Sequence, residues 1–255
     1  MGPGHPAIKK VAHSDVSTAK DVEAVLQKLA NPQRAVQMQR FFKTGPGEYG
    51  SGDHMLGISV PLQREVARQH RNIAVAEALA LLQSPWHEVR LTALFLLVHL
   101  FQKGDAAQRR TVFDGYLANL DRVNNWDLVD SSAPYIAGAF TADNPMPLLK
   151  RLVKSSSLWA RRVAAISTFH HLVHGSAKPT LFVAKALLHD QEDLIHKATG
   201  WMLREMGARV GITALRAFLD EHAATMPRTM LRYALEKMTE KEKVRYMAAG
   251  RNTKA

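Results

Sequence analysis

The sequence predicts an all-α protein, and three observations lead to this prediction. Apolar residues recur at helical spacing along nearly the whole chain, whereas no segment alternates apolar and polar residues as a strand would. Helix starts carry proline signals, since Asn31-Pro32 opens QRAVQMQRFF and Val60-Pro61 opens LQREVARQHR. Similar helix-opening sequences also return at regular intervals.

Beyond the two helices that open at Pro32 and Pro61, the apolar spacing predicts helices in ten further segments: 73–83, 86–102, 105–120, 123–139, 146–154, 157–174, 179–189, 191–207, 209–224 and 227–247. We expect residues 1–18 to form a flexible N-terminal segment and residues 248–255 a tail. Residues 19–247 are then expected to form a single domain.

The repeated openings are SPWHEVRLTALFLL (84–97), VNNWDLVDSSAPYI (123–136), SSLWARRVAAISTF (156–169), DLIHKATGWMLREM (193–206) and MPRTMLRYALEKM (226–238). Aligning them places Arg90, Asp130, Arg162, Lys197 and Arg232 at near-equivalent positions, separated by 130 − 90 = 40, 162 − 130 = 32, 197 − 162 = 35 and 232 − 197 = 35 residues. Such periods, filled by helix pairs, are typical of HEAT-like repeats stacked into a curved α-solenoid. We therefore expect this row on one concave face.

The composition favours a polyanionic partner. Lys plus Arg number 34 against 23 Asp plus Glu, which gives a net charge of +11 at pH 7. Nucleic acid is the commonest such partner, although a basic surface without one remains an alternative. No apolar segment is long enough for a membrane span, and the absence of cysteine excludes disulfide and thiolate chemistry. We expect a cytoplasmic protein, associated with the nucleoid through DNA.

One acid interrupts the cationic row, in VNNWDLVD. Asp127 and Asp130 share a helix side at spacing i, i+3, and we expect Asp127 to cap the helix or to pair across a repeat boundary. Asp130 weakens attraction to phosphate, so it either forms a buried pair with an arginine or performs chemistry. Hydrolysis of an N-glycosidic bond needs only one carboxylate to stabilise the sugar cation if the departing base is already positively charged.

Four tryptophans extend this interpretation, because an indole stabilises a nearby cationic base by about 0.5–2 kcal/mol. Trp86 and Trp159 are expected to lie in the core. For Trp126 and Trp201 the sequence leaves both a core position and a position in the site open.

Several segments in the same order resemble the AlkD family of alkylpurine DNA glycosylases: NPQRAVQMQ (31–39), RFFKTGPGEYGSGDHMLGI (40–58), WDLVD (126–130), LWARRVAAI (158–166) and HKATGWMLREM (196–206). The resemblance covers roughly residues 20–245. It implies a HEAT-like solenoid that binds duplex DNA and excises N3-alkyladenine and N7-alkylguanine without a metal or cofactor. It further implies that Asp130 is the catalytic acid, that Arg162 contacts a phosphate beside the lesion, and that Trp126 and Trp201 flank the acid.

Basic residues in and beside the row are expected to contact DNA phosphates: Arg90, Arg161, Lys197, Arg204, Arg228 and Arg232. We expect a monomer to suffice for this binding. A non-catalytic HEAT-repeat scaffold for nucleic acid or protein is the alternative to the enzyme.

Two other sequence patterns resemble those of ligand sites. GPGEYG (45–50) matches G-x-G-x-x-G, but no strand is expected before it, which argues against dinucleotide binding. FHHLVH (169–174) places His170 and His174 at i, i+4 without the acid of an HExxH motif, and we expect no metal there.

Overall fold

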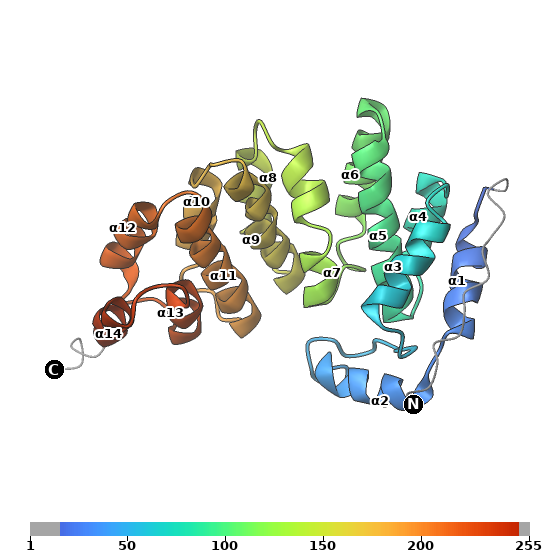
Figure 1. Ribbon diagram of the computed structural model, residues 1–255, viewed down its shortest axis with the longest axis horizontal. Helices are drawn as coiled ribbons and strands as arrows, with labels where there is room; N and C mark the ends of the chain where they lie inside the picture. Colours follow the sequence, from blue (N-terminus) through green and yellow to red (C-terminus); the bar gives the residue numbers. More distant parts are fainter. Residues whose placement is uncertain (1–15, 250–255) are drawn as a thin grey trace. The chain divides into compact units, whose positions relative to one another are not determined.

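The computed structural model describes residues 16–249, and within them the chain contains 14 α-helices, one π-helical turn and no β-strand (Figure 1). The predicted all-α class is therefore confirmed. The chain divides into two compact units, Met1–Ser132 and Ala133–Ala255. Most of the predicted flexible segment 1–18 and of the predicted tail 248–255 lies outside the described residues.

The first unit is built around α5. Its helices are α1 (Ala19–Lys28), α2 (Pro32–Phe41), α3 (Val60–Gln69), α4 (Val75–Leu81), α5 (His87–Lys103), α6 (Ala106–Ala118) and α7 (Trp126–Asp130). Helices α3, α4, α6 and α7 all contact α5, which is apolar on nearly every side and fully buries Leu94, Leu96 and Leu97. A helix that is apolar all round belongs in the interior, because each buried leucine contributes about 1.5–3 kcal/mol.

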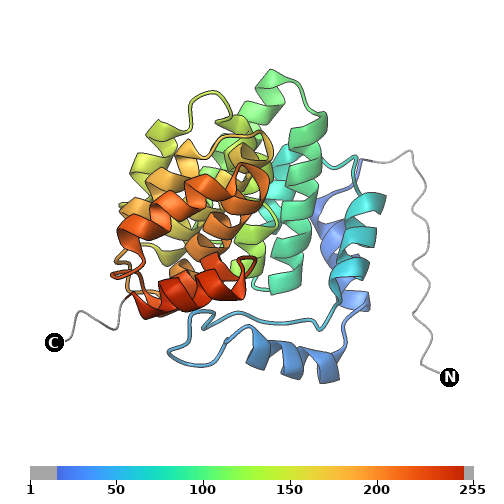
Figure 2. The same ribbon diagram turned by 60° about the vertical axis from the view of Figure 1, so that its left-hand side comes forward.

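Helix α2 leaves this stack and returns through the long loop 42–59 (Figures 1 and 2). The loop is anchored by the buried carboxylate of Glu88 on α5, which accepts hydrogen bonds from the backbone amides of Leu56, Gly57 and Ile58 at 2.9, 2.7 and 3.2 Å. Gly57 has a φ of 82°, and a Cβ there would lie 2.1 Å from the carbonyl oxygen of Asn31. The loop thus follows one fixed path between α2 and α3.

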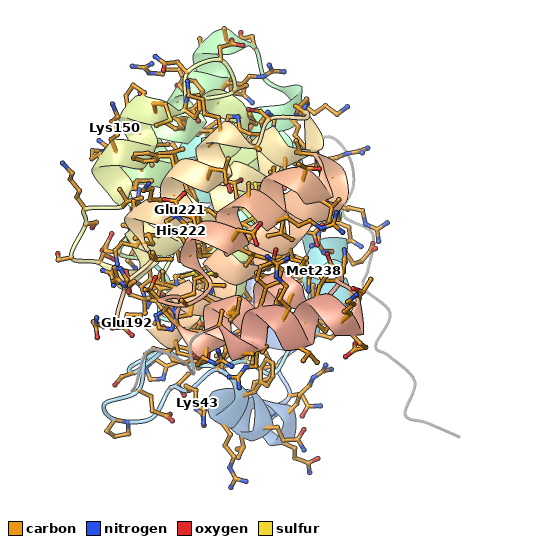
Figure 3. The ribbon with its side chains drawn as sticks, turned by 90° about the vertical axis from the view of Figure 1, so that its left-hand side faces the viewer. Lys43, Lys150, Glu192, Glu221, His222 and Met238 are labelled. Carbon is orange, nitrogen blue, oxygen red and sulfur yellow. The ribbon has the colours of Figure 1, made fainter. Side chains whose placement is uncertain are left out.

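The second unit stacks helices in pairs. It contains the π-helical turn η1 (Pro134–Gly138) and the helices α8 (Met146–Leu152), α9 (Leu158–Val173), α10 (Lys178–Ala186), α11 (Asp193–Arg209), α12 (Ile212–His222), α13 (Arg228–Leu235) and α14 (Glu240–Ala248). Helices α9, α11 and α13 pack in succession, with α8 and α10 against α9 and α12 against α11. Figure 3 labels Glu221 and His222 at the end of α12. This pairing agrees with the predicted helical repeats.

Close approach of α11 and α13 depends on Gly200. A Cβ at this position would lie 2.5 Å from the carbonyl oxygen of Met230 and 2.6 Å from the Cβ of Tyr233. Only glycine therefore fits at this contact without moving one helix away from the other.

Two of the predicted helices are each divided in the structure. The segment 123–139 becomes α7 and η1, because Pro134 has no N–H to donate and the next turn is closed by Gly138 N–H donating to the carbonyl of Ala133 at 2.9 Å. The segment 227–247 becomes α13 and α14, because Thr239 and Glu242 form a capping box that starts a new helix.

Candidate functional site

Helix α7 has its start fixed by local side chains. It consists of the five residues WDLVD, and the side-chain oxygen of Asn125 accepts a hydrogen bond from Trp126 N at 2.8 Å. The side-chain amide of Asn125 donates to the carbonyl of Phe42 at 3.4 Å. The turn that carries both acids is thereby tied to the loop that follows α2.

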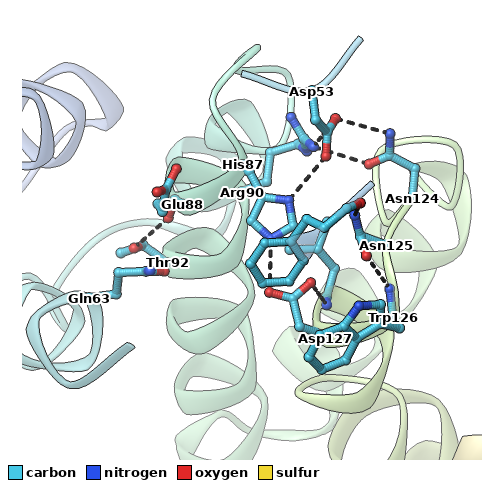
Figure 4. Close-up of polar contacts among 12 residues, drawn as sticks. Asp53, Gln63, His87, Glu88, Arg90, Thr92, Asn124, Asn125, Trp126 and Asp127 are labelled. Atoms are coloured by element: carbon cyan, nitrogen blue, oxygen red, sulfur yellow. Dashed lines mark hydrogen bonds and ion pairs between the residues drawn. The ribbon is translucent and has the colours of Figure 1, made fainter. Parts of the chain in front are cut away.

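Asp127 is held by a buried histidine (Figure 4). Its Oδ2 lies 2.8 Å from Nε2 of His87, the first residue of α5, and its Oδ1 accepts from Leu128 N at 2.9 Å. The opposite ring nitrogen of His87, Nδ1, lies 3.0 Å from Oδ2 of Asp53. Of the two roles expected for Asp127, a helix cap or a pair across a repeat boundary, the structure shows a pair, with a residue of α5.

His87 is positively charged at neutral pH. Burial by itself lowers the pKa of His87, but Asp127 and Asp53 outweigh burial and raise this pKa to about 9. Burial likewise raises the pKa of Asp53, yet hydrogen bonds and charges of His87 and Arg90 lower it overall. The two carboxylates and two cations thus balance, which is the condition for keeping four charged groups in an interior.

Arg90 belongs to this buried cluster, and this corrects its predicted place in the DNA-binding row. Its side chain is 2% exposed, and Nη2 donates to Asp53 at 2.6 Å and to Asn124 at 3.1 Å. Arg90 is the fourth residue of α5, whereas Asp130 is the fifth residue of α7. One residue turns a side chain by about 100° around a helix, so the two positions face different directions.

Trp126 lies in a small aromatic cluster. Its ring stacks on Phe42, with centroids 5.4 Å apart and planes inclined by 20°, and it meets the edge of Phe41 at 5.7 Å. Phe41 is 64% exposed, and Trp126 is half-buried. Sequence reasoning missed both phenylalanines, although their adjacency in RFFK just before the loop was a usable signal.

Asp130 is the last residue of α7 and is half-buried. Its negative charge reaches the buried hydroxyl of Tyr116: burial raises the pKa of Tyr116, the hydrogen bond with Ser132 lowers it, and Asp130 raises it. Asp130 therefore lies at the edge of the apolar core, where a charge acts more strongly than in water.

The other predicted site residues belong to the second unit. Arg162, the fifth residue of α9, is 5% exposed and donates from Nη1 to the carbonyl of Leu194 at 2.6 Å. Trp201 is half-buried on α11, which packs against α9. Trp159 is 8% exposed, as expected for a core residue, whereas Trp86 in the first unit is half-buried.

The basic residues predicted to contact phosphate differ in their surroundings. Lys197 pairs with Asp193 at 2.7 Å and Arg161 with Asp190 at 2.6 Å. Arg204 forms ion pairs with Glu205 and Glu236, Arg228 donates to the carbonyl of Met247 at 2.8 Å, and Arg232 is exposed. Phosphate would compete with carboxylates at Lys197, Arg161 and Arg204, and these contacts stay predictions.

The structure also shows the surroundings of the two other sequence patterns, GPGEYG and FHHLVH. The loop containing GPGEYG follows α2 and not a strand. His174 donates from Nδ1 to the carbonyl of His170 at 2.7 Å, and residues 16–249 contain no group of three or more His, Asp or Glu placed to hold a metal ion. Within the same residues, no helix has the length and apolarity that crossing a membrane requires.

Comparison with known proteins identifies the family. The model of a family described as DNA alkylation repair enzyme matches residues 22–238, which is most of the chain. The chain belongs to the DNA alkylation repair enzyme family. This family implies DNA as the partner.

A solved structure supports the fold of this family member. It is described as "Predicted DNA alkylation repair enzyme from Enterococcus faecalis", with a TM-score of 0.65 and 16% sequence identity over 83% of this chain and 97% of that one. At this identity the match shows the helical-repeat fold alone. None of the curated proteins compared matches the chain.

Proposed function

We propose that the protein is a monofunctional DNA glycosylase that hydrolyses the N-glycosidic bond of cationic alkylated purines in duplex DNA. N3-alkyladenine and N7-alkylguanine are the proposed substrates, and a cytoplasmic monomer is the proposed active form. The observation that carries the proposal is the division between the two acids of WDLVD. Asp127 is buried and bound by His87, which also binds Asp53, whereas Asp130 is the half-buried acid at the end of the same helix.

The proposed reaction needs one carboxylate. As the bond from the sugar to the purine nitrogen breaks, its electron pair neutralises the cationic base, and the sugar becomes an oxocarbenium ion. Asp130 stabilises this ion electrostatically and orients the water that attacks it, and the proton released from the water passes to the carboxylate or to solvent. Because the leaving base departs neutral, no general acid is required.

The aromatic cluster suits a cationic base. The half-buried face of Trp126, backed by Phe42 and flanked by the exposed Phe41, offers cation–π attraction of about 0.5–2 kcal/mol. Trp201 is proposed to flank the lesion as well, and Arg162 to contact a phosphate beside it.

Base release from a duplex with a single N7-methylguanine tests the proposal. Wild type is expected to release the methylated base and no normal guanine, whereas Asp130→Asn is expected to lose release by at least about 100-fold, the scale of removing one preorganised electrostatic group. Asp121→Asn removes the same charge from an exposed position just before α7 and serves as the matched control.

Duplex affinity measured in parallel separates catalysis from binding. A glycosylase keeps or gains affinity in Asp130→Asn while losing release. If wild type releases neither N7-methylguanine nor N3-methyladenine, while Asp130→Asn binds duplex more tightly, the fold serves as a scaffold and the proposal fails.

A further inference from the structure

The first unit contains a cationic pocket that the proposed reaction does not use. It has a volume of about 470 Å³ and lies between α3 and α5. Arg64, Arg68 and Arg71 line it from α3 and the turn that follows, and Phe95 and His99 line it from α5. We call this the Arg64–Arg71 pocket.

Helical spacing explains how the pocket forms. Arg64 and Arg68 stand at i and i+4, so they project from one side of α3, and Phe95 and His99 stand at i and i+4 on α5. Arg71 lines the pocket from the turn that follows α3. The guanidinium carbon of Arg64 lies 4.1 Å from the centroid of the Phe95 ring. This stacking holds the planar guanidinium in place while its N–H edge stays available for an acceptor.

Acidic groups do not balance the positive charge of the pocket. Arg68 pairs with Glu65, but within residues 16–249 neither Arg64 nor Arg71 takes part in an ion pair. The pKa of His99 reflects this excess of positive charge. Burial lowers this pKa, and the positive charges of Arg71 and Lys103 lower it further. The pocket also differs from a solvated basic helix face, because it is a concave site lined by the aromatic side chain of Phe95.

The dimensions favour an extended anion. From Arg64 to Arg68 α3 rises about 6 Å, at 1.5 Å per residue, and Arg71 lies beyond it in the turn that follows. Successive nucleotides of one DNA strand rise about 3.4 Å, so the arginines are spread over more than one nucleotide. A single inorganic phosphate would occupy only part of this row. Phe95 and the nearby Ala67 would face the sugars.

We propose that the Arg64–Arg71 pocket binds the phosphate backbone of a DNA strand. This site is a second anchor for DNA, formed by other residues than the acids and tryptophans assigned to base release. It rests on DNA as the partner and not on glycosylase activity. Undamaged duplex therefore tests it, and a failure to excise alkylated bases leaves it unaffected.

The first test compares two triple variants by fluorescence anisotropy on a labelled undamaged duplex at several salt concentrations. Arg64→Gln/Arg68→Gln/Arg71→Gln removes three charges from the pocket. Lys20→Gln/Lys28→Gln/Arg110→Gln removes three charges from exposed positions on α1 and α6 and is the matched control. The pocket variant is expected to lose at least about tenfold in affinity and to reduce the slope of log K against log salt by about 3, since each of the three phosphate contacts contributes about 0.9.

Equal losses in the two triple variants would overturn the proposal, because only net charge would then matter. Inorganic phosphate, titrated against both variants, distinguishes the sources of the anion. If the pocket variant loses phosphate binding but keeps wild-type DNA affinity and salt slope, the site holds a free anion and the proposal is wrong.

A second measurement needs no variant and covers the case in which loss of the Arg64–Phe95 stacking prevents folding. Amide hydrogen exchange of the wild-type protein is followed with and without undamaged duplex. Slower exchange in the segment 60–71 is expected on DNA addition, with no change in α6. Unchanged exchange in 60–71 at saturating DNA would contradict the proposal.

Discussion

The two units place a buried histidine on a central helix in opposite electrostatic settings. His87 of α5 lies between Asp53 and Asp127, and the two carboxylates outweigh burial and raise its pKa to about 9. His171 of α9 is also buried, but its ionisable neighbours are the histidines His170 and His174, and burial together with these neighbours lowers its pKa to about 4. At neutral pH the first is a cation and the second is neutral.

The two units join their helices by different means. In the first unit a charged histidine links α5 to α7 and to the loop after α2, because both ring nitrogens donate to carboxylates. In the second unit contact between α11 and α13 depends on the small size of Gly200. Removing the charge of His87 should therefore destabilise the first unit, and filling the space at Gly200 should destabilise the second.

The largest expected effect comes from His87→Gln. This change leaves Asp53 and Asp127 buried without the cation between them, and we expect a loss of about 3–5 kcal/mol in the free energy of unfolding, the scale for breaking a buried ion pair. His171→Gln is the matched control, because it removes a buried neutral histidine, and it should cost clearly less. Urea unfolding measures both, and equal losses would remove the distinction between the two histidines.

The pH dependence of stability should have opposite signs in the two units. The raised pKa of His87 contributes stability that is complete below pH 6.5 and is lost as pH rises through about 9, about 3 kcal/mol in total. The lowered pKa of His171 contributes stability that is complete above pH 6.5 and is lost as pH falls towards about 4.

Hydrogen exchange resolved by peptide, corrected for the intrinsic effect of pH, reports the two units separately. We expect α5 and α7 to lose protection on the alkaline side and α9 on the acid side. His87→Gln should abolish the alkaline loss. A common pH profile in both units would contradict the assignment.

A smaller effect is expected from Gly200→Ala. The new Cβ would lie 2.5 Å from the carbonyl oxygen of Met230, and moving α13 to relieve this contact should cost about 1–3 kcal/mol. Gly211→Ala is the control, because its Cβ would have no heavy atom outside its chain neighbours within 4 Å. If thermal unfolding shows the same shift for both, contact between α11 and α13 does not depend on glycine.

Features set by residues close in sequence could be predicted, whereas contacts that the loop 42–59 creates between distant residues could not. Helical periodicity predicted the helices, and for Asp127 the sequence left two roles open, a helix cap or a pair across a repeat boundary, of which the structure shows a pair. The partner His87 and its second acid Asp53 lie 40 and 74 residues from Asp127 (127 − 87 and 127 − 53), and the path of loop 42–59 that brings Asp53 in has no periodic signal. Arg90 was misplaced because alignment of repeats does not fix a helix start to one residue.

The central claim is that the two acids of WDLVD have different roles, and one paired measurement tests it. Single-turnover release of N7-methylguanine and thermal unfolding are measured for Asp127→Asn and Asp130→Asn beside wild type. The account predicts that Asp127→Asn lowers the unfolding temperature and still releases base where it is folded. Asp130→Asn should stay folded and lose base release by at least about 100-fold. Loss of base release in folded Asp127→Asn with retention in Asp130→Asn would contradict the account.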